Sequence, residues 1–214
     1  IAKYIQNGNA SARLFSSAEI TPEDAGHGIV VDIKTPQNIT QVTADMYSNA
    51  MLTAGITDAK VEVAAPKQVT GHSALAGIYK AYEVSTGEKL DTERTDVANQ
   101  ELGVATDLAE KSGVDQDKVS QLLTEIKQQI AEQKPATKEE VAQIVDDKLN
   151  ELKISLSDED RQLLVDLIDL GGKLTDSINN LKDSVNENTG FWDKVVNWFK
   201  NLFGMNDDQE TESK

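Results

Sequence analysis

The part of the sequence that most constrains the fold is residues 38–83, where the spacing of apolar side chains changes twice. From Ile39 to Gly55 apolar residues recur at three- and four-residue steps, which is the pattern of an amphipathic helix. Residues 60–65 alternate between apolar and polar side chains, as a half-buried strand does. A second helical pattern begins near residues 70–73 and stops at Thr86-Gly87. Helix, strand and helix around one apolar seam predict the core of an α/β unit.

The ends of these elements also carry signals. Asn38 is in position to cap the first helix, and Gln41, three residues later, suggests a capping box. Upstream, residues 10–20 alternate imperfectly and residues 29–34 alternate cleanly, with turn-forming residues 21–26 between them. We therefore expect a β-hairpin before the first helix, which gives the element order β-β-α-β-α.

Beyond Gly87 the sequence is rich in charges and helical in its period. Two pairs of residues mark helix starts: Thr137 with Glu140, and Ser157 with Asp160. We expect Gly171-Gly172 to end the helix that begins at Ser157, because consecutive glycines disfavour a helix interior. The five predicted helices cover residues 95–111, 115–133, 137–152, 157–170 and 174–185, and their short connections favour an up-and-down bundle or helical hairpins.

The predicted fold class is therefore α+β, with a small β-β-α-β-α sheet domain followed by an all-α helical hairpin or bundle domain. Residues 1–90 form the α/β sandwich domain, and because the chain does not begin with Met we expect a piece upstream of it to be absent. Residues 91–188 form the helical domain. Residues 189–204 form an aromatic amphipathic helix, and residues 205–214 an acidic, disordered tail.

Composition excludes several classes of function. The formal charge of −16 argues against a nucleic-acid partner, because a phosphate backbone requires clustered basic residues. The chain has no cysteine, so it has no disulfide, thiolate nucleophile or cysteine metal ligand. No apolar stretch approaches the roughly 18–20 residues of a membrane span.

The loop around Thr70, His72 and Ser73 is the only candidate for a reactive site. It combines hydroxyl groups, a glycine and a histidine at a strand-to-helix junction, where α/β proteins often bind ligands. It lacks the Gly-Lys-Ser/Thr of a phosphate-binding loop, and Leu75 stands where a nucleophile elbow has glycine. A helix cap, with the glycine allowing close packing, is the favoured interpretation.

Metal and cofactor sites are not predicted. His27 and His72 are the only histidines, and a zinc site would need them to converge from unconnected loops. The acidic pairs near residues 115–117 and 158–160 lack the spacing and glycine of a calcium loop and suit helix N-termini instead. We assign no catalytic, cofactor-binding or metal-binding residue from the sequence.

The aromatic residues are concentrated near the C-terminus. Half of them, including both tryptophans, fall within residues 191–203. On a helical wheel the apolar residues share one broad face, with charged and amide residues opposite, which suits a membrane interface or a partner groove. The alternative is that this helix packs onto its own bundle or pairs with a second copy of the chain. The possible interaction surface comprises Phe191, Trp192, Val195, Trp198, Phe199 and Phe203.

Three runs of the sequence resemble the YpuA-like family of Gram-positive bacteria, whose function is unknown. They are residues 46–56, 61–66 and 69–83, followed by Thr86-Gly87. The resemblance covers about residues 4–90 and continues more loosely toward residue 170. It implies an exported protein made with a signal peptide and a further N-terminal segment, and therefore an extracellular or cell-surface location. By the same resemblance, we expect the domain of residues 1–90 to be truncated at its N-terminus. The resemblance implies no catalytic residue to carry over.

Two hypotheses of function follow. The first is a secreted or envelope-associated, non-enzymatic binding or structural protein that contacts membrane, envelope or a partner chain through its aromatic helix. The alternative is an extracellular hydrolase that acts on envelope material, with its site near residues 70–73.

Overall fold

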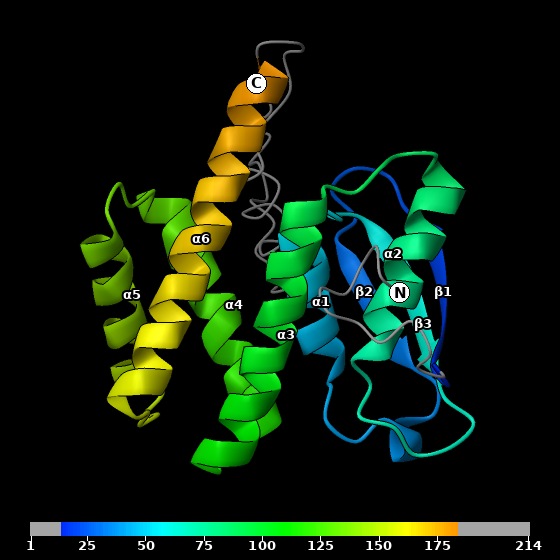
Figure 1. Cartoon of the computed structure of the whole chain (residues 1–214), viewed down its shortest axis with the longest axis horizontal. Coiled ribbons are helices and arrows are strands. Elements are labelled where there is room, and N and C mark those ends of the chain that lie inside the picture. Colours follow the sequence, from blue (N-terminus) through cyan, green and yellow to red (C-terminus); the bar gives the residue numbers. More distant parts are fainter. Residues whose placement is uncertain (1–13, 184–214) are drawn as a thin grey trace, which may run out of the picture.

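The structure, a computed structural model, describes the backbone of residues 14–183 and the side chains of residues 14–173. Its sheet contains β1 (Ser17–Pro22), β2 (Ile29–Ile33) and β3 (Ala59–Ala64), in the spatial order β1-β3-β2. The outer strand β1 is antiparallel to β3, whereas β2 is parallel to it. Six helices accompany this small sheet, and the α+β prediction is confirmed (Figure 1).

The predicted β-hairpin is wrong. β1 and β2 do not pair with each other, because β3 lies between them and pairs with both. Their connection is held instead by the start of β3, where the Asp58 carboxylate accepts hydrogen bonds from the backbone N–H groups of Gly26 and Gly28. Turn-forming residues predict a reversal of the chain, but they do not say whether the two strands become neighbours.

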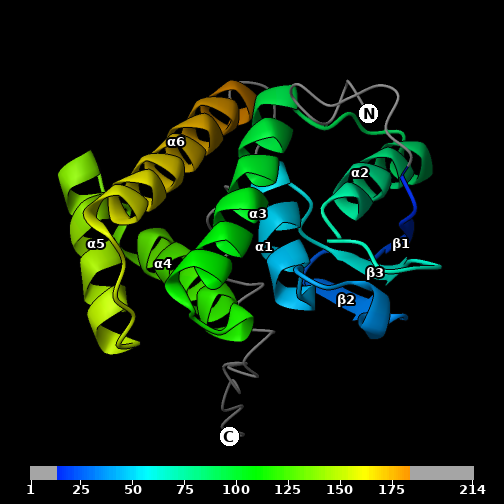
Figure 2. The same cartoon turned by 60° about the horizontal axis from the view of Figure 1, so that its bottom comes forward.

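Helices α1 (Ala44–Ala54) and α2 (Ser73–Thr86) cover the same face of the sheet (Figure 2). β3 presents Ala59, Val61 and Val63 to these helices, and all three are fully buried. Lys60 and Glu62 point to the opposite, solvent-facing side. The alternation predicted for this strand is therefore confirmed, and α1 and α2 confirm the two predicted helices around it.

The first helix starts later than predicted. Thr43 is its N-cap, and the Thr43 hydroxyl accepts a hydrogen bond from the backbone N–H of Met46. Asn38 instead closes the short 3-10 helix η1 (Pro36–Asn38), and its side-chain amide donates to the carbonyl oxygen of Ala65. The predicted cap at Asn38 is wrong, because this side chain is used in a contact between distant segments that sequence spacing does not reveal.

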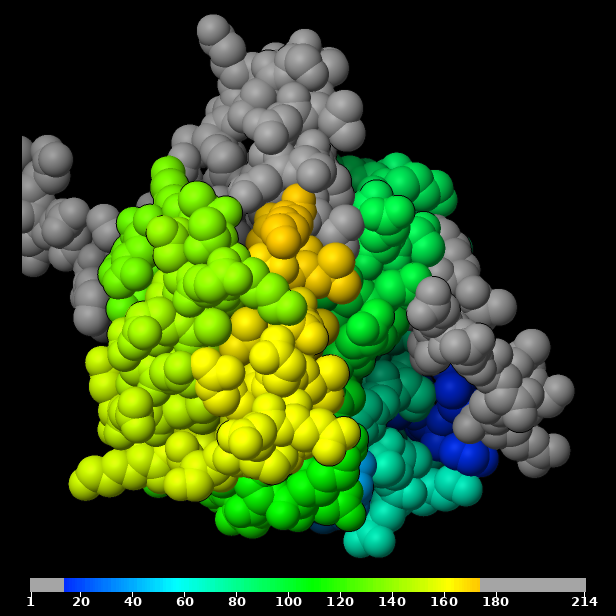
Figure 3. Space-filling view, turned by 60° about the vertical axis from the view of Figure 1, so that its left-hand side comes forward, coloured from blue at the N-terminus to red at the C-terminus, as the bar shows by residue number. Residues whose placement is uncertain are grey.

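Four helices follow: α3 (Thr92–Ser112), α4 (Gln116–Gln133), α5 (Lys138–Glu151) and α6 (Asp158–Asp183). The capping box of Thr137 and Glu140 is present at the start of α5, as predicted. Figure 3 shows the outer face of this part, where α6 lies between α5 and α3.

The prediction that Gly171-Gly172 ends a helix is wrong. α6 runs through both glycines, so the fourth and fifth predicted helices are one continuous element. A Cβ placed on Gly171 would lie 3.7 Å from the Val97 side chain of α3, which shows how closely the two helices approach there. The helical spacing of apolar residues on both sides of the glycines outweighs the local cost of glycine, which is about 1 kcal/mol per residue.

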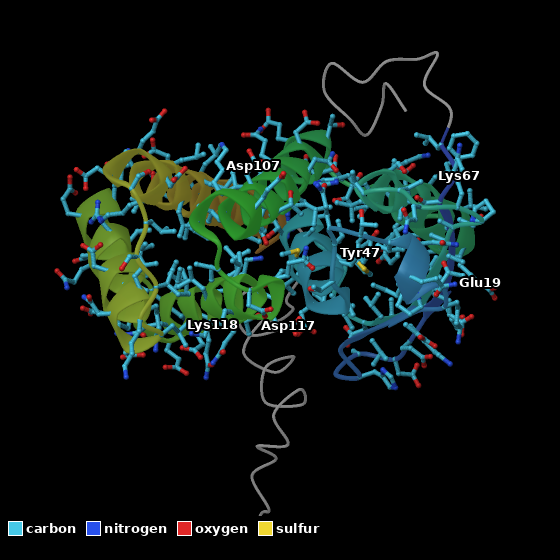
Figure 4. All side chains as sticks on the ribbon, turned by 90° about the horizontal axis from the view of Figure 1, so that it is seen from below. Glu19, Tyr47, Lys67, Asp107, Asp117 and Lys118 are labelled. Carbon is cyan, nitrogen blue, oxygen red and sulfur yellow. The ribbon has the colours of Figure 1, made fainter. Side chains whose placement is uncertain are left out.

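Nearly all of the buried apolar side chains among the described residues form one contiguous cluster that extends from Ile20 in β1 to Ile168 in α6. α1 belongs to both halves of the molecule, because it packs against β2 on one side and against α3 and α4 on the other. Charged residues such as Asp107 and Lys118 lie at the surface, whereas Tyr47 of α1 lies inside (Figure 4). The domain boundary near residue 90 stays a prediction.

Candidate functional site

The loop predicted as a reactive site is a junction between three elements. The His72 ring lies 2.9 Å (Nε2) from the Thr106 hydroxyl of α3 and 3.1 Å (Nδ1) from the Thr70 hydroxyl. The Ser73 hydroxyl lies 3.1 Å from that of Ser16, next to the start of β1. Among the described residues, His72 and Ser73 share no hydrogen bond. Their polar groups connect the start of α2 to α3 and to the sheet.

Burial lowers the pKa of His72 below its ordinary value of 6.5, because a partly buried ring disfavours the charged form. The nearby carboxylate of Asp107 opposes this shift. The neutral ring suits its two hydroxyl neighbours, since one ring nitrogen can donate and the other accept.

Gly71 allows this loop to pack tightly against α1. Its φ of +110° is one that other residues rarely adopt, and an added Cβ would lie 2.8 Å from both Ile39 Cγ2 and the Tyr47 hydroxyl. That hydroxyl donates a 2.6 Å hydrogen bond to the Gly71 carbonyl oxygen, and burial raises the pKa of Tyr47. The close packing of the glycine that the sequence predicted is present here. The predicted helix cap is wrong, because the N-cap residue His72 makes no side-chain capping hydrogen bond.

The two histidines are not brought together with acidic ligands. His27 is exposed in the connection between β1 and β2, whereas His72 faces α3. Within the described ranges, no group of three or more histidine or carboxylate side chains is placed to hold a metal ion.

The interior contains an ionic network that the sequence analysis missed. The Lys127 ammonium of α4 donates to Glu101 Oε1 of α3 and, at 2.9 and 3.0 Å, to the Asn49 carbonyl and Thr53 hydroxyl oxygens of α1. The Thr53 hydroxyl in turn donates to Glu101 Oε2 at 2.6 Å. Lys127 and Glu101 are only 7% and 2% exposed. Burial lowers the pKa of Lys127, and Glu101 opposes that shift.

The sequence contains a pattern that indicates this network. Glu101 stands four residues after Val97 and four before Ala105, within the apolar stripe of α3. Lys127 stands beside Ile126 and four residues after Leu123, at an apolar position of α4. Opposite charges at core positions of two neighbouring helices indicate a buried pair, because unpaired charges are rarely buried.

Arg94 makes a second tie between α3 and the end of α1. Its guanidinium donates from Nε to the Thr53 carbonyl oxygen at 2.9 Å and from Nη2 to that of Leu52 at 3.3 Å. Burial lowers the pKa of Arg94 to about 10. Gly55 makes room for it, since an added Cβ there would lie 2.9 Å from Arg94 Nη1. Cations suit this position, because a helix C-terminus carries partial negative charge.

Two surface pockets are found among the described residues. One, of about 400 Å³, lies beside Gly55, Tyr82 and Arg94. The other, of about 290 Å³, lies between the α4–α5 connection and α6, where Ile130, Pro135 and Ile168 line it. The predicted aromatic surface (Phe191, Trp192, Val195, Trp198, Phe199, Phe203) lies outside the described residues.

The chain belongs to the DUF1002 family, described as a protein of unknown function, which it matches over residues 1–188. It is 34% identical over 217 residues to the uncharacterized protein YpuA of Bacillus subtilis (strain 168), covering 95% of this chain and 73% of that protein. The expected family is thereby confirmed. No solved structure matches the chain. Among the helices described for residues 14–183, none is both long and apolar enough to cross a membrane.

Proposed function

We propose that this chain is a non-enzymatic binding protein of the cell envelope, and that it contacts a membrane surface through residues 191–203. The observation that carries the proposal is the concentration of half of the aromatic residues, including both tryptophans, in this one amphipathic stretch. Tryptophan at the boundary of an amphipathic helix is typical of interfacial segments. The resemblance to an exported family supports a location outside the cell.

The contacts of the described residues support a role in binding rather than catalysis. The polar groups of the loop at residues 70–73 join α2 to α3 and β1. The buried charges of Lys127 and Arg94 join α3 and α4 to α1. These are the groups that would otherwise be candidates for chemistry, and each is engaged in holding elements together.

Co-sedimentation with lipid vesicles tests the proposal. We expect the full chain to sediment with anionic vesicles. A chain that ends at residue 189 should stay in solution. Phe199→Asp should weaken binding because it places a charge on the apolar face, whereas Asn197→Asp adds the same charge on the polar face and should change binding little.

Equal sedimentation of the full chain and the chain that ends at residue 189 would contradict the proposal. Binding to neutral and anionic vesicles alike would show that apolar contacts dominate, as the weakly basic polar face, with Lys194 and Lys200, suggests. Retention on purified cell-wall material without vesicle binding would move the contact from the membrane to another envelope surface and overturn the membrane proposal.

A further inference from the structure

α6 carries a row of apolar residues that extends beyond the helix bundle. The row begins with Leu163, Leu167 and Leu170, and Leu174, Ile178 and Leu181 continue it, always at steps of three or four residues. Such spacing is that of a coiled-coil seam. Leu163 and Leu170 are 48% and 43% exposed, whereas most of the other large apolar residues in the described part of the chain are buried.

The partners of α6 leave part of this row open. α6 packs on α3 and α5, and Leu164, Leu167 and Ile168 are buried, whereas Leu163 and Leu170 stay exposed. Gly171 faces Val97 of α3. In Figure 1 the C-terminal end of α6 extends past α3, α4 and α5, so no other described helix accompanies it there. A long apolar row beside solvent favours a covering partner.

The segment that follows has a matching row. Trp192, Val195, Phe199 and Leu202 are separated by steps of three, four and three residues. The two rows are joined by residues 184–190, a connection of about seven residues that ends in Gly190 and falls within the usual range for antiparallel helices. As a helix, residues 191–203 would be about 18 Å long, which is also the length of α6 from Gly171 to Asp183.

We propose that residues 191–203 fold back as a helix antiparallel to the C-terminal half of α6 and cover its apolar row. Trp192 then lies near Leu181 and Ile178, and Phe203 lies next to Leu170, the described end of the row. The result is a helical hairpin that projects from the bundle. The occupant of the exposed α6 face is thus the chain's own aromatic segment, which has the spacing, length and connection to reach it.

The tryptophans report on this hairpin, because both lie in the aromatic segment. Without lipid, the full chain should emit in the blue, as buried tryptophan does. Ile178→Asp places a charge in the proposed seam and should shift the emission to the red. Asn180→Asp adds the same charge on another side of α6 and should leave the emission unchanged. A wild-type chain that already emits in the red would overturn the proposal.

Cross-linking gives a second test that does not depend on a destabilised variant. The chain has no cysteine, so Leu170→Cys and Phe203→Cys introduce one defined pair. With an added oxidant, this pair should form an intramolecular disulfide, seen as a monomer whose mass falls by two hydrogens. Val84→Cys with Phe203→Cys is the control, because Val84 is exposed on α2, away from α6, and should not cross-link within the chain. Absence of the first cross-link, or disulfide-linked dimers in its place, would overturn the proposal, and dimers would identify a second copy as the occupant.

The hairpin and the membrane contact can fail separately. Cross-linking without any vesicle binding leaves the hairpin in place and removes the proposed function. Vesicle binding by a chain that does not cross-link leaves the proposed function in place and overturns the hairpin. If both hold, the segment must leave α6 to reach the membrane, so the cross-linked chain should lose vesicle binding until the disulfide is reduced.

Discussion

The ammonium group of Lys127 lies where the apolar stripe of α4 meets α1 and α3, and oxygen atoms of three residues surround it. Removal of two charges from water is costly, and their attraction offsets that cost only when the remaining hydrogen bonds are also made. Here Thr53 bonds to both members of the pair. The network therefore fixes how α1, α3 and α4 meet, and each partner depends on the other.

Lys127→Met should lower the free energy of unfolding by about 3–5 kcal/mol, because the Glu101 carboxylate is left buried and unpaired. The double variant Lys127→Met/Glu101→Leu should recover most of that loss. Urea denaturation followed by circular dichroism measures both. Lys118→Met is the control, since Lys118 is exposed on the same helix and its change should fall within about 0.5 kcal/mol. A single variant as stable as wild type would contradict a tightly coupled pair.

His72 should make stability depend on pH. Its pKa is lowered in the folded state, so the unfolded chain takes up the proton first as the pH falls. The stabilising contribution is therefore complete above about pH 6.5, where the unfolded histidine titrates, and is lost as the pH falls toward the folded pKa. The difference in unfolding free energy between wild type and His72→Gln should shrink from pH 8 to pH 5.5. A difference that stays constant from pH 8 to pH 5.5 would contradict this prediction.

At the scale of elements, α6 shows that a helix is decided by its packed face as well as by its local sequence. Two consecutive glycines weaken it locally, yet Leu164, Ile168 and their neighbours are buried along one side. A Cβ at Gly171 would lie 3.7 Å from the Val97 side chain of α3, an ordinary contact distance. The glycines therefore lie inside a packed helix rather than at a helix end.

Gly171→Ala distinguishes these two possibilities. Within a continuous helix, alanine should raise the free energy of unfolding by about 0.5–1 kcal/mol, because it restricts the unfolded chain and its Cβ would meet Val97 at an ordinary distance of 3.7 Å. If residue 171 ended a helix in the left-handed conformation, alanine would be destabilising. Gly87→Ala supplies that comparison, since Gly87 ends α2 with φ of +75° and should lose about 1 kcal/mol or more. Thermal unfolding of both variants measures the sign.

At the scale of the whole molecule, α1 is the element that both halves share. Its buried residues face the sheet on one side and the helices α3 and α4 on the other. Arg94 binds the end of α1, and Lys127 binds its middle. The core is therefore continuous across the predicted domain boundary near residue 90.

A chain that ends at residue 90 tests that boundary. We expect residues 1–90 alone to unfold without a cooperative transition in urea, because the side of α1 that packs on α3 and α4 would be exposed to water. The chain that ends at residue 189 is the control and should unfold cooperatively. A sharp transition for residues 1–90 would show that the sheet and its two helices form an independent domain.

The sequence predicted the kinds of elements and most of their ends, because these follow from local spacing and capping. Val61 and Val63 alternate with the charged residues Lys60 and Glu62, which marks a strand. Thr137 and Glu140 form a capping box that starts a helix through local hydrogen bonds alone. The sequence also predicted that the loop at Gly71 packs closely. These features depend on residues that are only a few positions apart, so they can be predicted from the sequence alone.

Tertiary structure alone decided the remaining features. The position of β3 between β1 and β2, the use of Asn38 as a donor to Ala65, and the pairing of Glu101 with Lys127 each join residues distant in sequence. Their energies depend on burial and on geometry set by the whole fold, so no local pattern contains them. The sequence determined which segments form helices and strands, and three-dimensional packing decided which of them meet and which charged groups lie between them.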